Sequence, residues 1–168
     1  PPDGNLPVMG GDALYELNGY PGSARAGFSH LHFTAFAYPD EWIALGYGNS
    51  IPPFFAEYVN AFDPNRQHAG GVYGYTRADN DAILSYDAML ALLQGCNLAL
   101  SNGKLNVTPQ DMQQGLKKVT GENAIQGVSG QIAFGPNGDP VDKTIVILFV
   151  DPQGHIKIEP TPLGRFLK

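Results

Sequence analysis

Residues 143–150 read KTIVILFV, a nearly continuous apolar run that is typical of a strand buried on both faces. Before it, Gly130–Phe134 has the composition of a strand, and residues 136–139 (PNGD) carry a turn signal around Asn-Gly. After it, residues 151–154 (DPQG) predict a second turn, and His155–Glu159 alternates apolar and polar residues as a half-exposed strand does. The C-terminal part of the chain therefore predicts a β meander.

Three segments upstream predict helices. Asp81–Ser101 is the clearest, because its apolar residues follow the 3.6-residue period almost without a break. Pro52–Phe62 begins with prolines at positions that a first helical turn permits, and Thr108 precedes Pro109 as the N-cap of a helix ending near Val119. The face expected to be buried in the clearest helix carries Ala82, Ile83, Tyr86, Met89, Leu90, Leu93, Cys96, Asn97 and Leu100.

Two strands are predicted closer to the N-terminus. Leu6–Met9 is a short apolar run that ends at two glycines, and Phe28–Tyr38 (FSHLHFTAFAY) is dense in aromatic and β-prone residues. The predicted order is therefore two strands, three helices and a β meander. This is an α/β pattern without the opening βαβ units that a doubly wound domain needs.

Composition excludes several classes of partner. The 168 residues carry a net charge of −6, only 15% are charged, and Lys117-Lys118 is the only adjacent basic pair. Nucleic acid and anionic membrane surfaces need clustered Lys and Arg, so neither is expected to bind. Cys96 is the single cysteine, which rules out an internal disulfide. No apolar run in the sequence approaches the ~18 residues of a membrane span.

Catalytic motifs are weak. His30 and His32 lie two apart on the predicted strand, so both would face one side, and such a pair can ligate zinc or iron. No third metal ligand has a convincing spacing. A metal-dependent enzyme is therefore an alternative function and not the main hypothesis. Cys96 lies in the most apolar helix and is expected to be buried and inert. We find no phosphate-binding glycine loop, and predict no catalytic residue and no cofactor.

Asp12 is the strongest candidate for a binding residue. It follows a predicted strand and Gly10-Gly11, where open α/β sheets place ligand groups, outside the carboxyl ends of strands. Capping a short helix over Ala13–Leu17 is an equal alternative for Asp12. Asp87, within the long helix, is interpreted as an exposed residue of its polar stripe.

Aromatic residues are frequent in the predicted loops and at element ends. They suit either the lining of a ligand cleft or the packing of a loop-rich surface, and the residues alone leave both interpretations open. They are Tyr15, Tyr20, Phe36, Tyr38, Tyr73 and Tyr75.

Three segments together resemble the type I periplasmic binding proteins, the fold of branched-chain amino-acid-binding receptors of ABC transporters. Residues 6–12 (LPVMGGD) are similar to a strand–Gly–x–acid segment of that family. Residues 85–88 (SYDA) are similar to its Tyr-Asp-Ala helix. Residues 127–134 (GVSGQIAF), the Gly138-Asp139 turn and the apolar run at 143–150 are similar to its closing signature.

The resemblance implies a Rossmann-like, three-layer architecture of which this chain is the C-terminal portion. Residues 1–65 resemble the end of the second lobe, residues 80–120 the last helices of the first lobe, and residues 127–160 the hinge return and final strands. Because the first half of such a receptor has no counterpart here, the chain alone is expected to bind amino acids negligibly. An incomplete sheet also leaves an unpaired edge, through which a homodimer is expected.

The resemblance further implies a non-enzymatic function, which is the capture of a small polar ligand such as an amino acid between lobes that close about a hinge. Asp12 matches the acid that pairs with the ligand's ammonium group, and Asp81 matches a cleft-facing position at the start of the long helix. Tyr15, Tyr38 and Tyr75 are the expected aromatic contacts. The implied location is extracytoplasmic, and the implied partner is a membrane permease. A sensor module fused to a signalling protein is the alternative.

Overall fold

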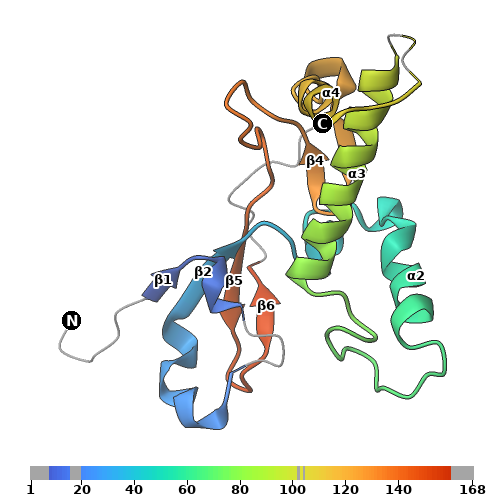
Figure 1. Ribbon diagram of the computed structural model, residues 1–168. Helices are drawn as coiled ribbons and strands as arrows, with labels where there is room; N and C mark the ends of the chain where they lie inside the picture. Colours follow the sequence, from blue (N-terminus) through green and yellow to red (C-terminus); the bar gives the residue numbers. More distant parts are fainter. Residues whose placement is uncertain (1–7, 16–19, 102, 104, 160–168) are drawn as a thin grey trace. The chain divides into compact units, whose positions relative to one another are not determined.

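The computed structural model describes residues 8–15, 20–101, 103 and 105–159 of the chain (Figure 1). These residues divide into two compact units. Unit 1 contains the described residues up to Ala82 and those from Ile145 onward, and unit 2 is Ile83–Thr144. Unit 1 is therefore built from two stretches of sequence, with unit 2 inserted between them.

Unit 1 is organised around a four-stranded sheet. Its central strand β2 (Leu31–Ala35) pairs in parallel with β1 (Val8–Gly10) and antiparallel with β5 (Val146–Val150). The last strand, β6 (Ile156–Ile158), pairs antiparallel with β5, which gives the order β1-β2-β5-β6. The predicted strand at the N-terminus is confirmed over Val8–Gly10; its residues 6 and 7 lie outside the described residues.

One face of this sheet carries the core of unit 1. Along β5, the side chains of Val146, Leu148 and Val150 are buried, whereas those of Ile147 and Phe149 are only half-buried. The prediction that this run is buried on both faces is therefore wrong. The continuous apolar sequence arises because the second face is partly covered as well. Phe28, Phe33, Ala35, Tyr38 and Ile156 complete the buried cluster.

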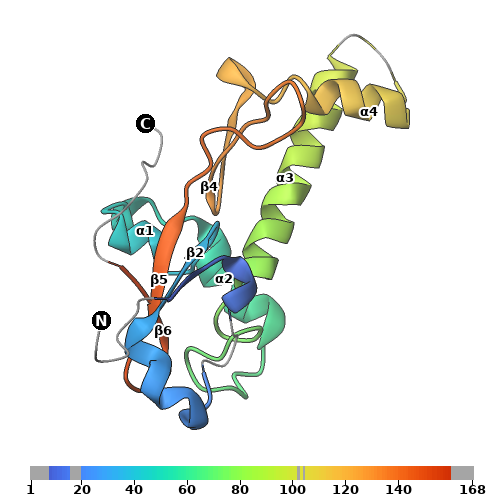
Figure 2. The same ribbon diagram turned by 90° about the vertical axis from the view of Figure 1, so that its left-hand side faces the viewer.

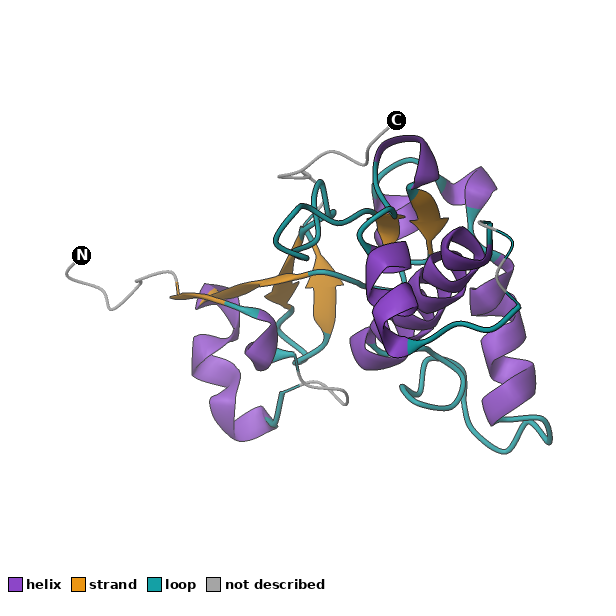
Figure 3. Ribbon diagram, turned by 45° about the horizontal axis from the view of Figure 1, so that its top comes forward, coloured by secondary structure: helices purple, strands orange, loops and turns teal. Residues whose placement is uncertain are grey.

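The segment before β2 differs from the prediction. The strand expected over Phe28–Tyr38 is confined to Leu31–Ala35, because residues 22–30 form a 3-10 helix, η2 (Gly22–His30). Figure 3 shows this helix as a separate element beside the sheet of unit 1. His30 ends the helix and His32 lies on the strand, so the two histidines do not share one strand face.

The other helices of unit 1 are short. α2 (Pro53–Phe62) begins with proline in its first turn, as the sequence predicts, and ends at Asp63. Both oxygens of Asp63 accept backbone hydrogen bonds from the following loop, from Gln67 at 2.8 Å and His68 at 3.0 Å. The one-turn helix α1 (Glu41–Ala44) was not predicted.

Unit 2 consists of two helices and a small hairpin. α3 (Asn80–Leu100) begins in the last three residues of unit 1, and Asp79 caps it by accepting a hydrogen bond from Ala82 N at 2.7 Å. α4 (Pro109–Leu116) has the predicted Thr108 cap, completed into a capping box by Asp111. Figure 2 shows α4 close to the C-terminal end of α3.

The hairpin of unit 2 joins β3 (Ile125–Gly127) to β4 (Gly130–Ile132), and these strands pair only with each other among the described residues. β4 therefore belongs to unit 2, while β5 and β6 belong to unit 1. The expected C-terminal β meander is thus divided between two sheets.

The packed side of α3 is not the predicted one. Its buried residues recur every four positions and are mostly small: Ile83, Asp87, Ala91, Gly95 and Ala99. Glycines at 95 and 115 bring α3 and α4 so close that a Cβ on Gly115 would overlap the Gly95 carbonyl. The large residues Met89 and Leu93, predicted to be buried, are exposed.

The expectation that no apolar run approaches the length of a membrane span needs correction. Among the described residues, α3 is the one helix long and apolar enough to cross a membrane by length and composition alone. In the middle of this helix, Asp87 is buried and hydrogen-bonded to the turn between β3 and β4.

Candidate ligand-binding site

The carboxyl ends of β1 and β2 bring three of the five predicted site residues to one edge of the sheet. Because these strands are parallel, the residues that follow them emerge on the same side. Asp12 and Tyr15 follow β1, and Tyr38 follows β2. The rings of Tyr15 and Tyr38 contact edge to face, with centroids 6.3 Å apart.

Asp12 is exposed at this edge. It is the first residue of a short 3-10 helix, η1 (Asp12–Leu14), and the residue at the N-cap is Gly11. The alternative that Asp12 caps a helix is therefore wrong for the described residues. The part of the expected helix at residues 16 and 17 lies outside them. An exposed carboxylate beyond a strand end is free to meet a cationic group.

Two residues from the loop before α3 complete the cluster. The ring of Tyr73 contacts that of Tyr15 at 5.9 Å, and the guanidinium of Arg77 lies over the rings of Tyr73 and Tyr38 at 5.2 and 5.4 Å. Arg77 also donates to Asp40 Oδ2 at 2.6 Å. We call Tyr15, Tyr38, Tyr73, Arg77 and Asp40 the tyrosine–arginine cluster. Sequence reasoning did not assign Arg77 or Asp40 to the site.

Two hydroxyl groups of the cluster, those of Tyr15 and Tyr38, are held neutral. Burial, reinforced by the neighbouring hydroxyl of Tyr73, raises the pKa of Tyr15 and of Tyr38 well above the ordinary range. Tyr38 donates its proton to the carbonyl of Ile156 at 2.6 Å, which anchors the ring to β6. The Tyr15 hydroxyl is buried without a partner of standard hydrogen-bond geometry. Its neighbour is the hydroxyl of Tyr73, whose interaction with Tyr15 contributes to the raised pKa.

Tyr75 and Asp81 lie outside the tyrosine–arginine cluster. The Tyr75 ring is exposed and stacks on the His68 ring, with centroids 3.8 Å apart. Asp81 is exposed in the first turn of α3, where the helix dipole favours a negative charge. The described contacts bring neither residue to the others, and both assignments stay predictions.

The alternative metal site does not assemble in the described residues. His32 Nε2 lies 3.2 Å from Glu159 Oε1, which provides one neighbouring carboxylate, but His30 is on another element. No group of three His, Cys, Asp or Glu side chains suited to a metal gathers in this part of the chain.

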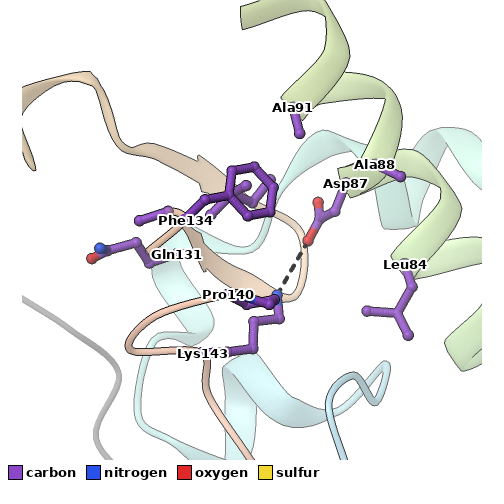
Figure 4. A pocket seen from close by; sticks show the side chains of 10 residues that line it. Leu84, Asp87, Ala88, Ala91, Gln131, Phe134, Pro140 and Lys143 are labelled. Atoms are coloured by element: carbon purple, nitrogen blue, oxygen red, sulfur yellow. Dashed lines mark ion pairs between the residues drawn. The ribbon is translucent and has the colours of Figure 1, made fainter. Parts of the chain in front are cut away.

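A second polar centre lies inside unit 2. The carboxylate of Asp87 is buried and accepts backbone hydrogen bonds from Val128 at 2.7 Å and Ser129 at 2.9 Å. It also accepts from the Ser129 hydroxyl, and the ammonium of Lys143 lies 3.6 Å away (Figure 4). The prediction that Asp87 is exposed is wrong. The four-residue spacing of Ile83, Asp87 and Ala91 could have predicted this burial, because it places Asp87 on the same face of α3 as the buried small residues.

A hollow of about 170 Å³ adjoins this centre. Figure 4 shows Leu84, Ala88 and Ala91 of α3 on one side and Phe134 and Gln131 on the other. Its lining is mainly apolar, with Asp87 and Lys143 as the charged groups. Since both charges already bind each other and Ser129, we interpret this centre as structural rather than as a ligand site.

Comparison with solved structures identifies the fold. No protein-family model and no curated protein matches the sequence. The chain is similar to two structures of an ABC transporter substrate-binding protein from Desulfitobacterium hafniense, one of them in complex with Leu. The TM-scores are 0.58 and, for the Leu complex, 0.57, at 21% and 20% identity. It is similar also to a candidate branched-chain amino acid ABC transporter from Rhodospirillum rubrum, with a TM-score of 0.53 at 20% identity.

The fold is that of a type I periplasmic binding protein, in part. Each match covers 94% of this chain but only 36–38% of the other chain. The predicted α/β class and periplasmic-binding-protein architecture are therefore confirmed. The chain corresponds to little more than a third of a complete periplasmic binding protein. The D. hafniense structures are of a substrate-binding protein.

Proposed function

We propose that this chain forms part of an extracytoplasmic solute-binding protein that captures an amino acid for an ABC transporter. The proposal is supported by one observation above the others: Asp12, Tyr15 and Tyr38 all follow the carboxyl ends of β1 and β2, and Tyr15 contacts Tyr38. This is the edge at which open α/β sheets bind ligands. The likeness to a binding protein in complex with Leu supports the class of ligand.

The chemistry of this edge suits an amino acid. An exposed carboxylate at Asp12 can pair with the ligand's ammonium group, and a charge-assisted hydrogen bond of this kind strengthens as water leaves a closing site. The aromatic faces of Tyr15 and Tyr38 offer an apolar surface for the ligand's side chain. The hydroxyl of Tyr15 can bond the ligand's carboxylate or a bound water.

The remaining contacts belong to the same proposal. Tyr75, in the loop before α3, and Asp81, in the first turn of α3, are further ligand contacts in this proposal. The membrane partner is a permease, and the protein acts outside the cytoplasm. No nucleic acid takes part, because the chain lacks clustered basic residues.

Calorimetry with the full-length protein tests the proposal. We expect saturable binding of leucine or a related amino acid, and weaker binding of the decarboxylated analogue isoamylamine and of the deaminated analogue isocaproate. Both analogues keep the leucine side chain, so the comparison isolates the two charged groups. Failure of the full-length protein to bind any amino acid in a screen of the common twenty would contradict the proposal.

A further inference from the structure

Arg77 supplies the positive charge of the tyrosine–arginine cluster, and several contacts restrict its orientation. The guanidinium lies over the rings of Tyr38 and Tyr73, at 5.4 and 5.2 Å from their centroids, and donates to Asp40 Oδ2 at 2.6 Å. A guanidinium is planar and matches the geometry of a carboxylate. Because its position is fixed in advance, this cation can bind an anionic group with little loss of conformational entropy.

One donor of the Arg77 guanidinium has no acceptor in the described part of the chain. Its Nε–H is buried and lacks a hydrogen-bond partner there. A guanidinium carries five N–H donors, and a buried donor without an acceptor costs free energy. Nε–H and one N–H of Nη2 point along the same edge of the group, and a carboxylate can bind this edge through both oxygens. Asp40 binds only the Nη2 half of it.

Asp40 is a partner that a second carboxylate can replace. Its side chain is 45% exposed, whereas that of Arg77 is 25% exposed. An ion pair with such an exposed member contributes little to stability, because water competes for the exposed group. A carboxylate that accepts from both Nε and Nη2 would therefore bind Arg77 more strongly than Asp40 does.

A series of contacts within unit 1 connects Arg77 to Asp12. The ring of Tyr38 lies below the guanidinium and contacts the ring of Tyr15, and Tyr15 donates its backbone N–H to the carbonyl of Asp12 at 2.9 Å. An α-amino acid carries its ammonium and carboxylate groups on one carbon, so its site needs a cation near the anion that binds the ammonium. Arg77 meets this requirement within the cluster.

We propose that Arg77 binds the carboxylate of the ligand through Nε and Nη2, in place of Asp40. The inference rests on the proposed function, because it concerns the same amino-acid site. It adds the partner of the ligand's second charged group. Asp40 then holds the guanidinium while the site is empty and competes with the ligand for it.

Three ligands that differ only in their charged groups test the role of Arg77. Calorimetry with the full-length protein measures the binding of leucine, isocaproate and isoamylamine. Arg77→Gln should weaken the binding of leucine and isocaproate by roughly 30-fold or more, as truncation of a desolvated charge pair does. Isoamylamine has no carboxylate, so its dissociation constant should not change. Arg66→Gln, at an exposed arginine of unit 1 that bonds Asn60, is the matched control and should leave all three unchanged.

Asp40→Asn tests the same inference with Arg77 in place. The substitution keeps the shape of the side chain and removes the charge that competes with the ligand. Leucine and isocaproate should bind roughly two- to fivefold more tightly, which corresponds to the strength of a partly exposed ion pair. Isoamylamine should bind as before. A pair that serves only packing predicts instead a loss of stability in urea without a gain in affinity.

Two results would overturn the role of Arg77 and leave the proposed function standing. The first is an equal loss of affinity for all three ligands in Arg77→Gln, since the arginine would then support the packing of the site or bond another part of the complete protein. The second is leucine binding that neither variant changes. Should Arg77→Gln fail to fold, an unchanged affinity of Asp40→Asn for isocaproate would decide against the inference. A wild-type protein that binds no amino acid would contradict both proposals.

Discussion

The carboxylate of Asp87 accepts a hydrogen bond from the backbone N–H of Val128 at 2.7 Å, between residues 41 apart in the sequence. The next backbone N–H, of Ser129, donates to the other oxygen of the same carboxylate at 2.9 Å. One side chain in the middle of α3 therefore fixes the turn between β3 and β4. The backbone at 127 accommodates this only because it is glycine, since a Cβ there would overlap the Asp87 carboxylate.

Asp87→Asn is expected to destabilise the chain. The amide can satisfy only one of the two backbone donors, and it removes the carboxylate charge that faces the half-buried ammonium of Lys143. Breaking a buried charge pair from one side costs about 3 kcal/mol. Urea unfolding should show this loss, whereas Asp81→Asn, at an exposed position of the same helix, should change stability little. A loss equal to that of Asp81→Asn would show that the network contributes nothing.

The tyrosine hydroxyls allow a paired experiment. Tyr38→Phe removes the hydrogen bond to the Ile156 carbonyl and should cost about 1 to 2 kcal/mol of unfolding free energy. Tyr15→Phe removes a buried hydroxyl whose contact with the Tyr73 hydroxyl lacks standard hydrogen-bond geometry, so it should cost less stability than Tyr38→Phe. If the hydroxyl of Tyr15 serves the ligand, the same variant should nevertheless weaken amino-acid binding. Equal stability losses in the two variants would contradict this distinction.

Asp12→Asn tests the ammonium contact in the full-length protein. The substitution keeps the shape and removes the charge, and truncating a desolvated charge pair weakens affinity by roughly 30-fold or more. Calorimetry with an amino-acid ligand measures the change, and Glu122→Gln, at an exposed site in unit 2, is the control. An unchanged dissociation constant in Asp12→Asn would remove this residue from the site.

Unit 1 should lose stability in acid through Asp63. Burial of this carboxyl opposes its ionisation, but the backbone N–H groups of Gln67 and His68 outweigh burial and lower its pKa below 3.8. A lowered pKa in the folded state contributes stability above the unfolded value, and that stability is lost as the pH falls through the folded value. The denaturant concentration at the unfolding midpoint should therefore fall as the pH drops below about 4. This fall should be less steep in Asp63→Asn than in the wild-type chain. Parallel pH profiles for the two proteins would contradict the role of Asp63.

Local signals in the sequence located the elements more reliably than their faces. Pro53 and Thr108 marked the first turns of α2 and α4, because prolines and caps act within a few residues of themselves. The orientation of α3 was missed because the period of its large apolar residues indicates an apolar face, whereas the small residues Gly95 and Ala99 permit the close approach of α4. Which of the two faces packs inside unit 2 depends on residues far away in the sequence.

The candidate site shows the same limit. Asp12, Tyr15 and Tyr38 could be placed from strand ends, since parallel strands deliver their following residues to one edge. Arg77 and Asp40 come from loops 37 residues apart, and no pattern in the sequence joins them. The sequence allowed a helical turn or a loop over residues 19–27, but the extension of the 3-10 helix to His30 was missed because residues 28–30 fit a strand as well as the residues after them do.

Unit 1 is built from two separate stretches of the sequence, and this has a consequence for biosynthesis. Tyr38 bonds the carbonyl of a residue 118 positions later, and β2 finds its antiparallel partner only after all of unit 2 has been made. The ribosome therefore synthesises β1 and β2 long before β5. The apolar face of these two strands stays exposed to solvent while α3 and α4 are synthesised. Long-range pairings of this kind form slowly and expose nascent chains to aggregation. Expression yield should therefore depend on the speed of translation and on chaperones that hold the early strands.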